Sequence, residues 1–354
     1  MSKRLFFPLF NALIGAIFGA AIGYYIFQIG LGVLVGALCG LTIGLGVEFI
    51  LSRLGQDRWL YQRRVLLLVM LEIPLVIFLL GPFAYVVVEA RPNPHPVCCE
   101  TPLDYGATGY DDVQIQTDDG VIISGWYVPP AGNPGPVIVL LHGARGDRTG
   151  TAWHARQLIS AGYGVLMYDQ RGTGESTGDR AYLGWMQAED LLKVLDLLET
   201  IPEVDTKKIG AVGLSRGAHT ALNAAFLEPE RMAALWLDGM QAQRIEDFPE
   251  AETPGEHFAT LINAIILKMD EIYFGQKAPP AFIEILSELS QVEMFIVAGG
   301  LAEFESIVNQ RYAQAMAANA QLWLIEDAWH VGGAVVAPKE YHQRMVAFFD
   351  LTLK

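Results

Sequence analysis

The stretch Lys208–Gly217 reads KIGAVGLSRG and decides the fold. Its apolar first half predicts a buried strand. Glycines two residues before and two residues after Ser215 allow the sharp turn that leads from such a strand into a helix. A serine at the apex of this turn becomes a nucleophile only when a base removes its proton. Because the pentapeptide also occurs by chance, the remaining sequence has to supply a base, an acid and donors for an oxyanion.

Short apolar runs alternate with helix-forming segments after residue 111. The first of these segments predicts a β-hairpin over residues 113–128. Buried strands and helices then alternate, which predicts an α/β fold with a mostly parallel sheet, helices on both faces, and function at the carboxyl ends of the strands. The strands are expected at 136–141, 164–168, 209–212, 234–237, 294–298 and 321–325, and the helices at 152–161, 185–200, 218–228 and 304–317.

A histidine follows the last predicted strand. His330 lies in the glycine-bounded loop 326–333, after the serine in the chain, and is therefore the predicted general base. His219 lies only four residues after the serine, on the same helix, where it is badly placed to accept the serine proton. His142 precedes the serine and is expected to brace a turn rather than to take part in catalysis.

The orienting acid is expected after the strand at 294–298. Glu303, three residues after Gly300, is the preferred candidate, because a carboxylate there can accept the second N–H of the histidine and stabilise the imidazolium. Glu305 and Asp238, at the end of the strand at 234–237, remain as alternatives.

Two backbone N–H groups are expected to form the oxyanion hole. Ala144 lies in the glycine-rich turn after the strand at 136–141, and Arg216 directly follows the serine. A second polar turn follows the strand at 164–168, and in it Asp169 and Arg171 are expected to form hydrogen bonds with the turn and with each other.

Residues 111–350 resemble the α/β-hydrolase superfamily, in particular its serine esterase-like and peptidase-like members. The motifs that carry the resemblance are LHG at 141–143, YDQRGTGES at 168–176, GLSRG at 213–217 and AWH at 328–330. The resemblance implies Ser215 as nucleophile, His330 as base and Glu303 as acid, with glutamate in place of the commoner aspartate. It also implies that no metal and no organic cofactor is needed.

These residues predict a serine hydrolase that cleaves a small-molecule or lipid-like carboxylic ester, or an amide or thioester, through an acyl-enzyme on Ser215. A catalytically silent binding module on the same fold is the alternative. Residues 241–292 are expected to include a small helical cap over the site, or only ordinary crossover helices.

The first ninety residues have a different composition from the rest. Three apolar segments, at about 6–27, 31–51 and 65–88, are long enough to cross a bilayer as helices, so residues 1–91 are predicted to form a membrane domain. Lysine and arginine precede the first span and lie within the loop between the second and third. The positive-inside rule therefore predicts a multi-pass protein of the cell membrane with its large domain outside the cytoplasm.

Glycine recurs at every fourth position in the first two spans. These positions share one helix face and permit close backbone contact. Whether this face packs within the hairpin or forms a homo-oligomer is left open by the sequence. The glycines are Gly15, Gly19 and Gly23 in the first span, and Gly32, Gly36, Gly40 and Gly44 in the second.

Residues 92–110 are rich in proline and are predicted to be an extended linker before the hydrolase domain at 111–354. The adjacent pair Cys98 and Cys99 lies in this segment, as an incidental pair, a redox element or a lipid-attachment point. Residues 101–354 carry seventeen Lys and Arg against thirty-four Asp and Glu. Such an acidic domain is repelled by phosphate backbones, so nucleic-acid binding is disfavoured.

Overall fold

The computed structural model describes residues 6–25, 29–53, 58–181, 183–316 and 318–354. The chain divides into two compact units. The first comprises Met1–Glu89 with Lys268–Tyr273, and the second comprises Ala90–Leu267 with Phe274–Lys354.

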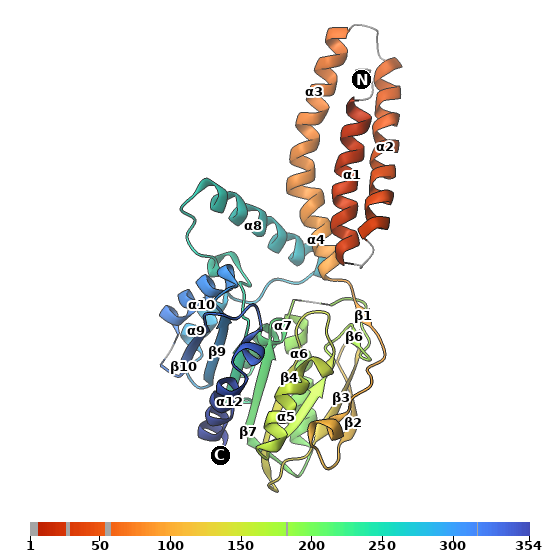
Figure 1. Cartoon of the computed structure of the whole chain (residues 1–354). Coiled ribbons are helices and arrows are strands. Elements are labelled where there is room, and N and C mark those ends of the chain that lie inside the picture. Colours follow the sequence, from red (N-terminus) through yellow and green to blue (C-terminus); the bar gives the residue numbers. More distant parts are fainter. Residues whose placement is uncertain (1–5, 26–28, 54–57, 182, 317) are drawn as a thin grey trace. The chain divides into compact units, whose positions relative to one another are not determined.

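The first unit is helical (Figure 1). Helix α1 spans Phe6–Tyr25 and α2 spans Ile29–Arg53. Helix α3, Arg58–Leu75, continues through a π-helical turn, Val76–Leu80, into α4, Gly81–Glu89. The π-helical turn begins two residues after Pro74, whose missing N–H interrupts the regular hydrogen-bond ladder.

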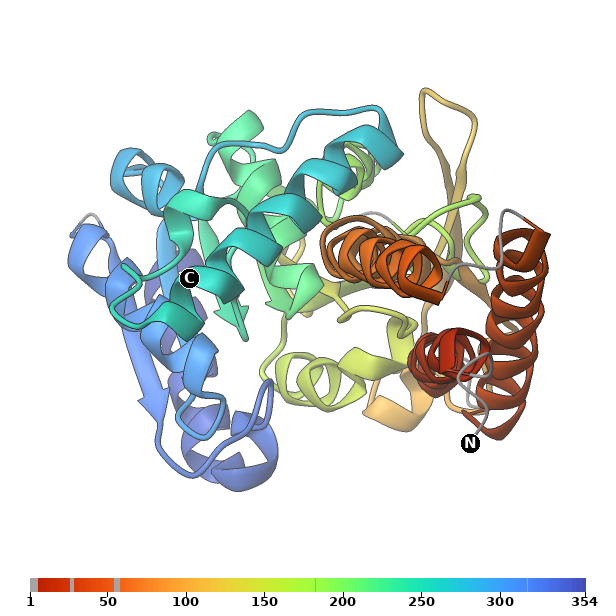
Figure 2. The ribbon, with the colours of Figure 1, turned by 90° about the horizontal axis from the view of Figure 1, so that it is seen from above.

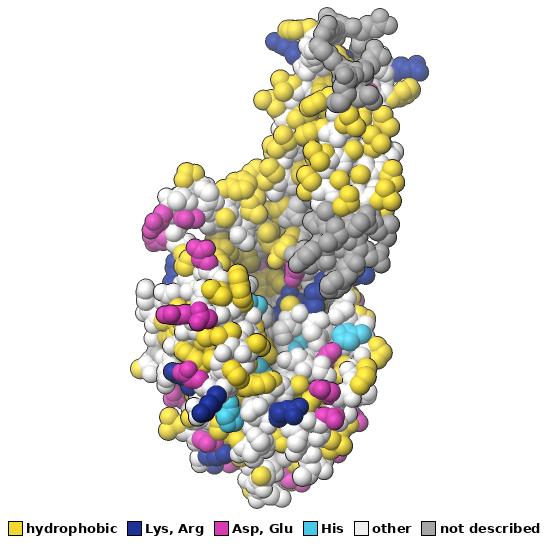
Figure 3. Space-filling view, viewed as in Figure 1, with side chains coloured by type: hydrophobic (Ala, Val, Ile, Leu, Met, Phe, Trp, Pro, Cys, Tyr) yellow, Lys and Arg dark blue, Asp and Glu magenta, His cyan; other side chains and the backbone are white. Residues whose placement is uncertain are grey.

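Apolar side chains cover the outside of these helices (Figure 3). Among the described residues, two helical stretches are long and apolar enough to cross a bilayer, Val33–Arg53 and Trp59–Glu89. In the first predicted span, the apolar stretch counted among the described residues of α1 is the shorter Phe6–Ile17, and the last two residues of that span lie outside the described part of the chain. The structure therefore supplies two candidate spans where the sequence predicts three.

The glycine face lies between α1 and α2. A Cβ atom added to Gly36 would collide with the carbonyl oxygen of Gly15, and one added to Gly40 would collide with that of Asn11. Only glycine permits this approach of the two backbones. At these positions the contact is within the hairpin, which is one of the two arrangements that the sequence leaves open.

The second unit is built on an eight-stranded sheet with the order β10-β9-β8-β7-β4-β5-β3-β2. In Figures 1 and 2 this order runs from the blue C-terminal strands to the tan β2–β3 hairpin. All neighbouring strands are parallel except at β3, which is antiparallel to β2 and β5. The strands are β2 (Asp111–Gln116), β3 (Ile122–Val128), β4 (Gly135–Leu141), β5 (Gly164–Tyr168), β7 (Val204–Leu214), β8 (Ala234–Asp238), β9 (Glu293–Gly299) and β10 (Ala320–Ile325).

Helices cover both faces of this sheet, as the strand composition predicts. Alternate residues of β4 enter different cores: Val139 packs in the core under one set of helices and Leu140 in the core under the other. One face carries α5 (Ala152–Ser160) and α12 (Pro338–Leu353), and the other carries α6 (Met186–Glu199), α7 (Arg216–Leu227), α9 (Phe282–Glu288) and α10 (Glu303–Ala315).

The segment between β8 and β9, where a cap is predicted at 241–292, contains three helical elements. These are η5 (Ile245–Asp247), α8 (Pro254–Phe274) and α9. Helix α9 buries Phe282 and Ile285 in the core, so it is an ordinary crossover helix. Helix α8 is the part of this insert that is available for a cap.

Residues 92–110, predicted as a linker, are part of the second unit instead. Asn93–Pro94 forms a short parallel strand, β1, beside β6 (Thr173–Gly174). The N–H groups of residues 93 and 95 donate to the carbonyl groups of Gly172 and Gly174. The prolines keep this segment extended, and an extended backbone finds partners on a neighbouring loop, which the sequence pattern does not reveal.

Candidate active site

Ser215 lies at the junction of β7 and α7, in a backbone conformation that residues other than glycine seldom adopt. Its backbone angles are φ 54° and ψ −115°, and its N–H donates to the carbonyl oxygen of Asp238 at 2.7 Å. A Cβ atom at Gly213 would lie 2.5 Å from the Cα of Ala218, and one at Gly217 would collide with the carbonyl oxygen of Leu141. The two glycines therefore permit the tight turn that exposes the serine.

His330 meets the serine from the loop after β10. Its Nε2 atom lies 2.8 Å from Ser215 Oγ, which is hydrogen-bond distance. The two residues are 115 positions apart in the chain, and the sheet brings them together because β7 and β10 end at the same edge. The structure thus places the predicted base beside the predicted nucleophile.

The carboxylate that contacts His330 is Glu305, not Glu303. Glu305 Oε2 contacts His330 Nδ1, and Oε1 accepts the N–H of Gly299 at 2.8 Å. Glu305 is buried, whereas Glu303 is exposed in the first turn of α10. Successive helical residues are about 100° apart, so two residues separated by two positions point to nearly opposite sides of the helix. The preference for Glu303 is therefore wrong as to which side chain reaches the histidine.

A helical pattern in the sequence carries the signal for Glu305. Glu305 shares one face of α10 with Val308, Asn309 and Tyr312, all of which are buried. The spacing of three, four and seven residues marks the inner face of a helix. Asn309 fixes this face further, since its Nδ2 donates to the carbonyl oxygens of Glu305 and Met240, both at 2.8 Å.

Asp238, the other alternative for the acid, has a different partner. Tyr341 donates its hydroxyl to Asp238 Oδ2 at 2.8 Å, and Trp236 Nε1 donates to the same Tyr341 oxygen at 2.7 Å. Burial raises the pKa of Asp238 to about 7, although the hydrogen bond from Tyr341 opposes the shift. Asp238 is therefore a buried neighbour of the site whose hydrogen bond comes from Tyr341.

Glu305 sets the protonation of His330. The hydrogen bond to Glu305 raises the pKa of His330 above its ordinary value of 6.5, and this effect outweighs the opposing effect of burial. Glu305 thus stabilises the imidazolium form, which is what a base needs once it has taken a proton. Because Nδ1 faces the carboxylate, Nε2 of the neutral ring is left unprotonated toward Ser215.

The two other histidines near the sheet edge have structural partners. His219 Nε2 accepts the N–H of Gln241 at 3.1 Å, and burial lowers its pKa to about 3. His142 lies 2.7 Å from the carbonyl oxygen of Gly143 through Nδ1 and accepts the N–H of Gln170 at 3.0 Å through Nε2. His142 therefore braces the loop after β4, as expected.

The loop after β4 runs alongside the serine. A Cβ atom at Gly143 would lie 3.4 Å from Ser215 Cβ, so the backbone of this loop lies directly beside the proposed nucleophile. Ala144, the first predicted oxyanion donor, is the next residue and is exposed. Arg216, the second, opens α7 directly after the serine.

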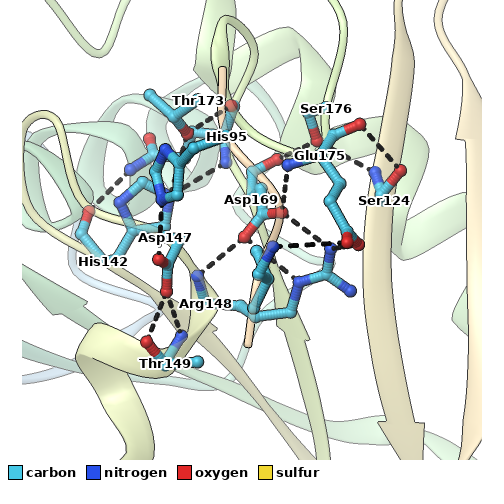
Figure 4. Close-up of polar contacts among 12 residues, drawn as sticks. His95, Ser124, His142, Asp147, Arg148, Thr149, Asp169, Thr173, Glu175 and Ser176 are labelled. Carbon is cyan, nitrogen blue, oxygen red and sulfur yellow. Dashed lines mark hydrogen bonds and ion pairs between the residues drawn. The ribbon is translucent and has the colours of Figure 1, made fainter. Parts of the chain in front are cut away.

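The polar turn after β5 forms hydrogen bonds with this loop (Figure 4). Asp169 is fully buried and accepts four hydrogen bonds, three from the main chain and side chain of Arg148 and one from the N–H of Glu175. Arg171 pairs with Asp190 and Asp119. Asp169 binds the turn through the N–H of Glu175, as expected. The ion pairs of Arg171 lead instead to Asp119 and Asp190, outside the turn.

The family model that matches this chain covers the part that contains Ser215. The family model of X-Pro dipeptidyl-peptidase (S15 family) matches residues 119–247. An uncharacterised protein of Mycobacterium tuberculosis is 34% identical over 119 residues, which cover 33% of this chain and 42% of that protein. A thiohydrolase of Arthrinium phaeospermum is 34% identical over 123 residues, covering 34% of this chain and 39% of that one. The chain thus spans about two fifths of these curated relatives.

Solved structures extend the likeness over a larger share of the chain. The esterase Pf2001 of Pyrococcus furiosus superposes with a TM-score of 0.58 at 22% identity, covering 74% of this chain and all of that one. A dienelactone hydrolase from Anabaena variabilis superposes with a TM-score of 0.52 at 19% identity, covering 70% and 99%. The chain has an α/β-hydrolase-like fold. At these identities the structural likeness establishes the fold alone, and the chemistry rests on the site.

Proposed function

We propose that this α/β-hydrolase is a serine hydrolase that cleaves carboxylic esters through an acyl-enzyme on Ser215. The observation that carries the proposal is the continuous contact from Ser215 Oγ through His330 to the buried carboxylate of Glu305. In acylation, Nε2 of His330 takes the serine proton while Oγ attacks the carbonyl carbon. The imidazolium, stabilised by Glu305, then protonates the leaving alcohol as the ester bond breaks.

Deacylation uses the same groups in reverse order. Water enters where the alcohol left, and His330 removes one of its protons as the oxygen attacks the acyl carbon. Collapse of the tetrahedral intermediate breaks the bond to Ser215 and returns the proton to Oγ. The main-chain N–H groups of Ala144 and Arg216 are the proposed donors to the oxyanion in both steps.

We favour an ester over an amide as the substrate because the structural neighbours include proteins named as esterases and a dienelactone hydrolase. The S15 family model and the thiohydrolase relative make amides and thioesters the competing substrates. The insert helix α8 exposes Phe258 and Leu261, and we propose that it contributes an apolar surface to the binding of the acyl group.

The nucleophile can be tested without any variant. The full-length chain in detergent, incubated with a fluorophosphonate probe and digested, is expected to carry the label on the peptide that contains Ser215. Heat-unfolded protein is the control and is expected to remain unlabelled, because activation of the serine depends on the folded site. A folded protein that takes no label would support the silent binding module instead, and label on another residue would assign the nucleophile elsewhere.

We also propose that residues 1–91 anchor the enzyme in the cell membrane as three spans, with the hydrolase unit outside the cytoplasm. The apolar helices Val33–Arg53 and Trp59–Glu89 and the flanking arginines support this arrangement. Fusion of an alkaline phosphatase after Lys354 is expected to give an active reporter, since that enzyme matures only outside the cytoplasm. Activity of a cytoplasmic reporter at the same position would reverse the proposed orientation.

A further inference from the structure

Residues 93–97, which we call the strap, lie against the loop that carries the proposed oxyanion donor. Asn93 Nδ2 donates to the carbonyl oxygen of Arg145 at 2.9 Å. His95 Nε2 lies 2.9 Å from Asp147 Oδ2 (Figure 4). Both contacts bridge 52 positions of sequence, and both reach residues within three positions of Ala144. The strap itself is fixed by its β1 pairing with Thr173–Gly174.

The loop is therefore held from three sides. His142 anchors its start through Gln170, and the buried pair of Arg148 and Asp169 anchors its end. Between these anchors, the N–H of Gly146 donates to the carbonyl oxygen of Gly143 at 3.3 Å, and Arg145 has a positive φ of 61°. Such a conformation is costly for a residue with a side chain, and it persists only where its surroundings hold it. The strap supplies the contacts on the remaining side.

The geometry of His95 specifies its charge. Nδ1 lies 2.8 Å from the carbonyl oxygen of Asn93, and Nε2 faces the carboxylate of Asp147. Both neighbours are acceptors, so both ring nitrogens must carry a proton, and only the imidazolium does. Asp147 is also engaged on its other oxygen, where Oδ1 accepts the N–H of Thr149 at 2.7 Å. Its carboxylate thus ties the strap to the turn at Arg148–Thr151, η4, that closes the loop.

We propose that protonated His95 and Asn93 are positioning residues for hydrolysis, clasping the strap to residues 143–147 so that the N–H of Ala144 is held toward the oxyanion. This inference rests on the proposed function. It gives the segment that follows residue 89 a role beyond linking, because what happens to the strap reaches the oxyanion donor through two hydrogen bonds.

We call the hydrogen bonds from Asn93 to Arg145 and from His95 to Asp147 the clasp. The clasp is expected to be complete when His95 is protonated and to weaken when His95 loses its proton. The hydrogen bond to Asp147 raises the pKa of His95 above 6.5, against the opposing effect of its partial burial. The clasp is therefore complete below pH 6.5 and weakens as the pH rises through the raised pKa. The other ionisable groups around it are Asp169, Arg148 and Glu175 from the loops and Cys98, the residue that follows the strap.

The test compares kcat of the full-length chain in detergent with that of His95→Gln on a p-nitrophenyl ester between pH 5.5 and 9. The ratio of the two values cancels the titration of His330, which both proteins share. We expect wild type to exceed His95→Gln about fivefold at pH 6, a small part of the roughly 10²–10³-fold effect of a whole oxyanion donor. The ratio should fall toward one as His95 loses its proton, with KM unchanged.

Two further measurements keep the outcome decisive. His342→Gln, on α12 and outside both the strap and the proposed acyl-binding helix, is the matched control and should give a ratio of one at every pH. Titration of ¹⁵N-histidine-labelled protein by NMR should place the pKa of His95 above 6.5 and lower it in Asp147→Asn, whether or not the protein hydrolyses anything. A flat ratio for His95→Gln would overturn the positioning role, and a His95 pKa at or below 6.5 would overturn the protonated clasp. Absence of hydrolysis by wild type would count against the proposed function instead.

Discussion

Ser215→Ala is expected to lower kcat for ester hydrolysis by about 10⁴-fold or more, because it removes the atom that forms the acyl-enzyme. His330 and Glu305 keep their contact in this variant. Because the nucleophile is missing, the remaining rate comes from substrate binding and from the oxyanion donors. The measurement is the rate of p-nitrophenol release by full-length protein in detergent, with KM determined separately. Fluorophosphonate labelling should disappear in parallel.

The effect must be separated from loss of the fold. Ser160→Ala, at an exposed position of α5, is the matched control and is expected to keep the wild-type rate. The melting temperature of Ser215→Ala should stay within a few degrees of wild type, since alanine occupies less space at the same turn. A Ser215→Ala protein that melts normally and retains a tenth or more of the activity would rule out a serine mechanism at this position.

The second large effect is expected from Glu305→Gln, with kcat falling by about 10²–10⁴-fold. The amide can still accept the N–H of Gly299 through one oxygen, so the helix start is preserved. Its NH₂ group, however, would face His330 Nδ1 and favour the ring tautomer with the proton on Nε2. A ring in that state cannot accept the proton of Ser215, and the imidazolium also loses its negative neighbour.

Glu303→Gln is the control for this experiment, because it makes the same chemical change two residues earlier on the same helix. Because Glu303 is exposed, the kcat of Glu303→Gln is expected to remain within about twofold of the wild-type value, which is the size of ordinary surface effects. Steady-state kinetics on the same ester compares the two variants directly. If Glu303→Gln were the impaired protein and Glu305→Gln the active one, the acid would be misassigned. Loss of activity in Asp238→Asn with both glutamate variants active would transfer the role to Asp238.

Most of the sheet can be predicted from the sequence because a buried parallel strand is a continuous apolar run bounded by turn residues. The strands predicted at 164–168 and 321–325 agree with the limits of β5 and β10 to within one residue. Ser215 and His330 are found in the same way, since each follows such a run in a loop that contains glycine. These are local signals: chain order sets His330 apart from His142, and the position of His219 on the helix that follows the serine sets His219 aside.

For the acid, the sequence offers three carboxylates, and the preferred one, Glu303, is not the one that contacts His330. The choice between Glu303 and Glu305 depends on where α10 begins and how it rotates against β9, and a shift of two residues turns a helix face almost fully around. Limits of helices are the least certain feature of a sequence pattern, because capping and packing both move them. Burial of the helix against the sheet resolves what the spacing leaves open.

What the sequence determines by itself is the α/β architecture, the glycine-flanked turn at Ser215, the loop that carries His330 and an apolar N-terminal region, because each is encoded in residues that are neighbours along the chain. Only the tertiary structure decides which carboxylate meets His330, and that residues 93–97 bind the loop beside Ser215. Both outcomes join residues 25 to 52 positions apart through single hydrogen bonds. Such bonds follow from the directions in which packed elements present their side chains, and no spacing along the chain records those directions.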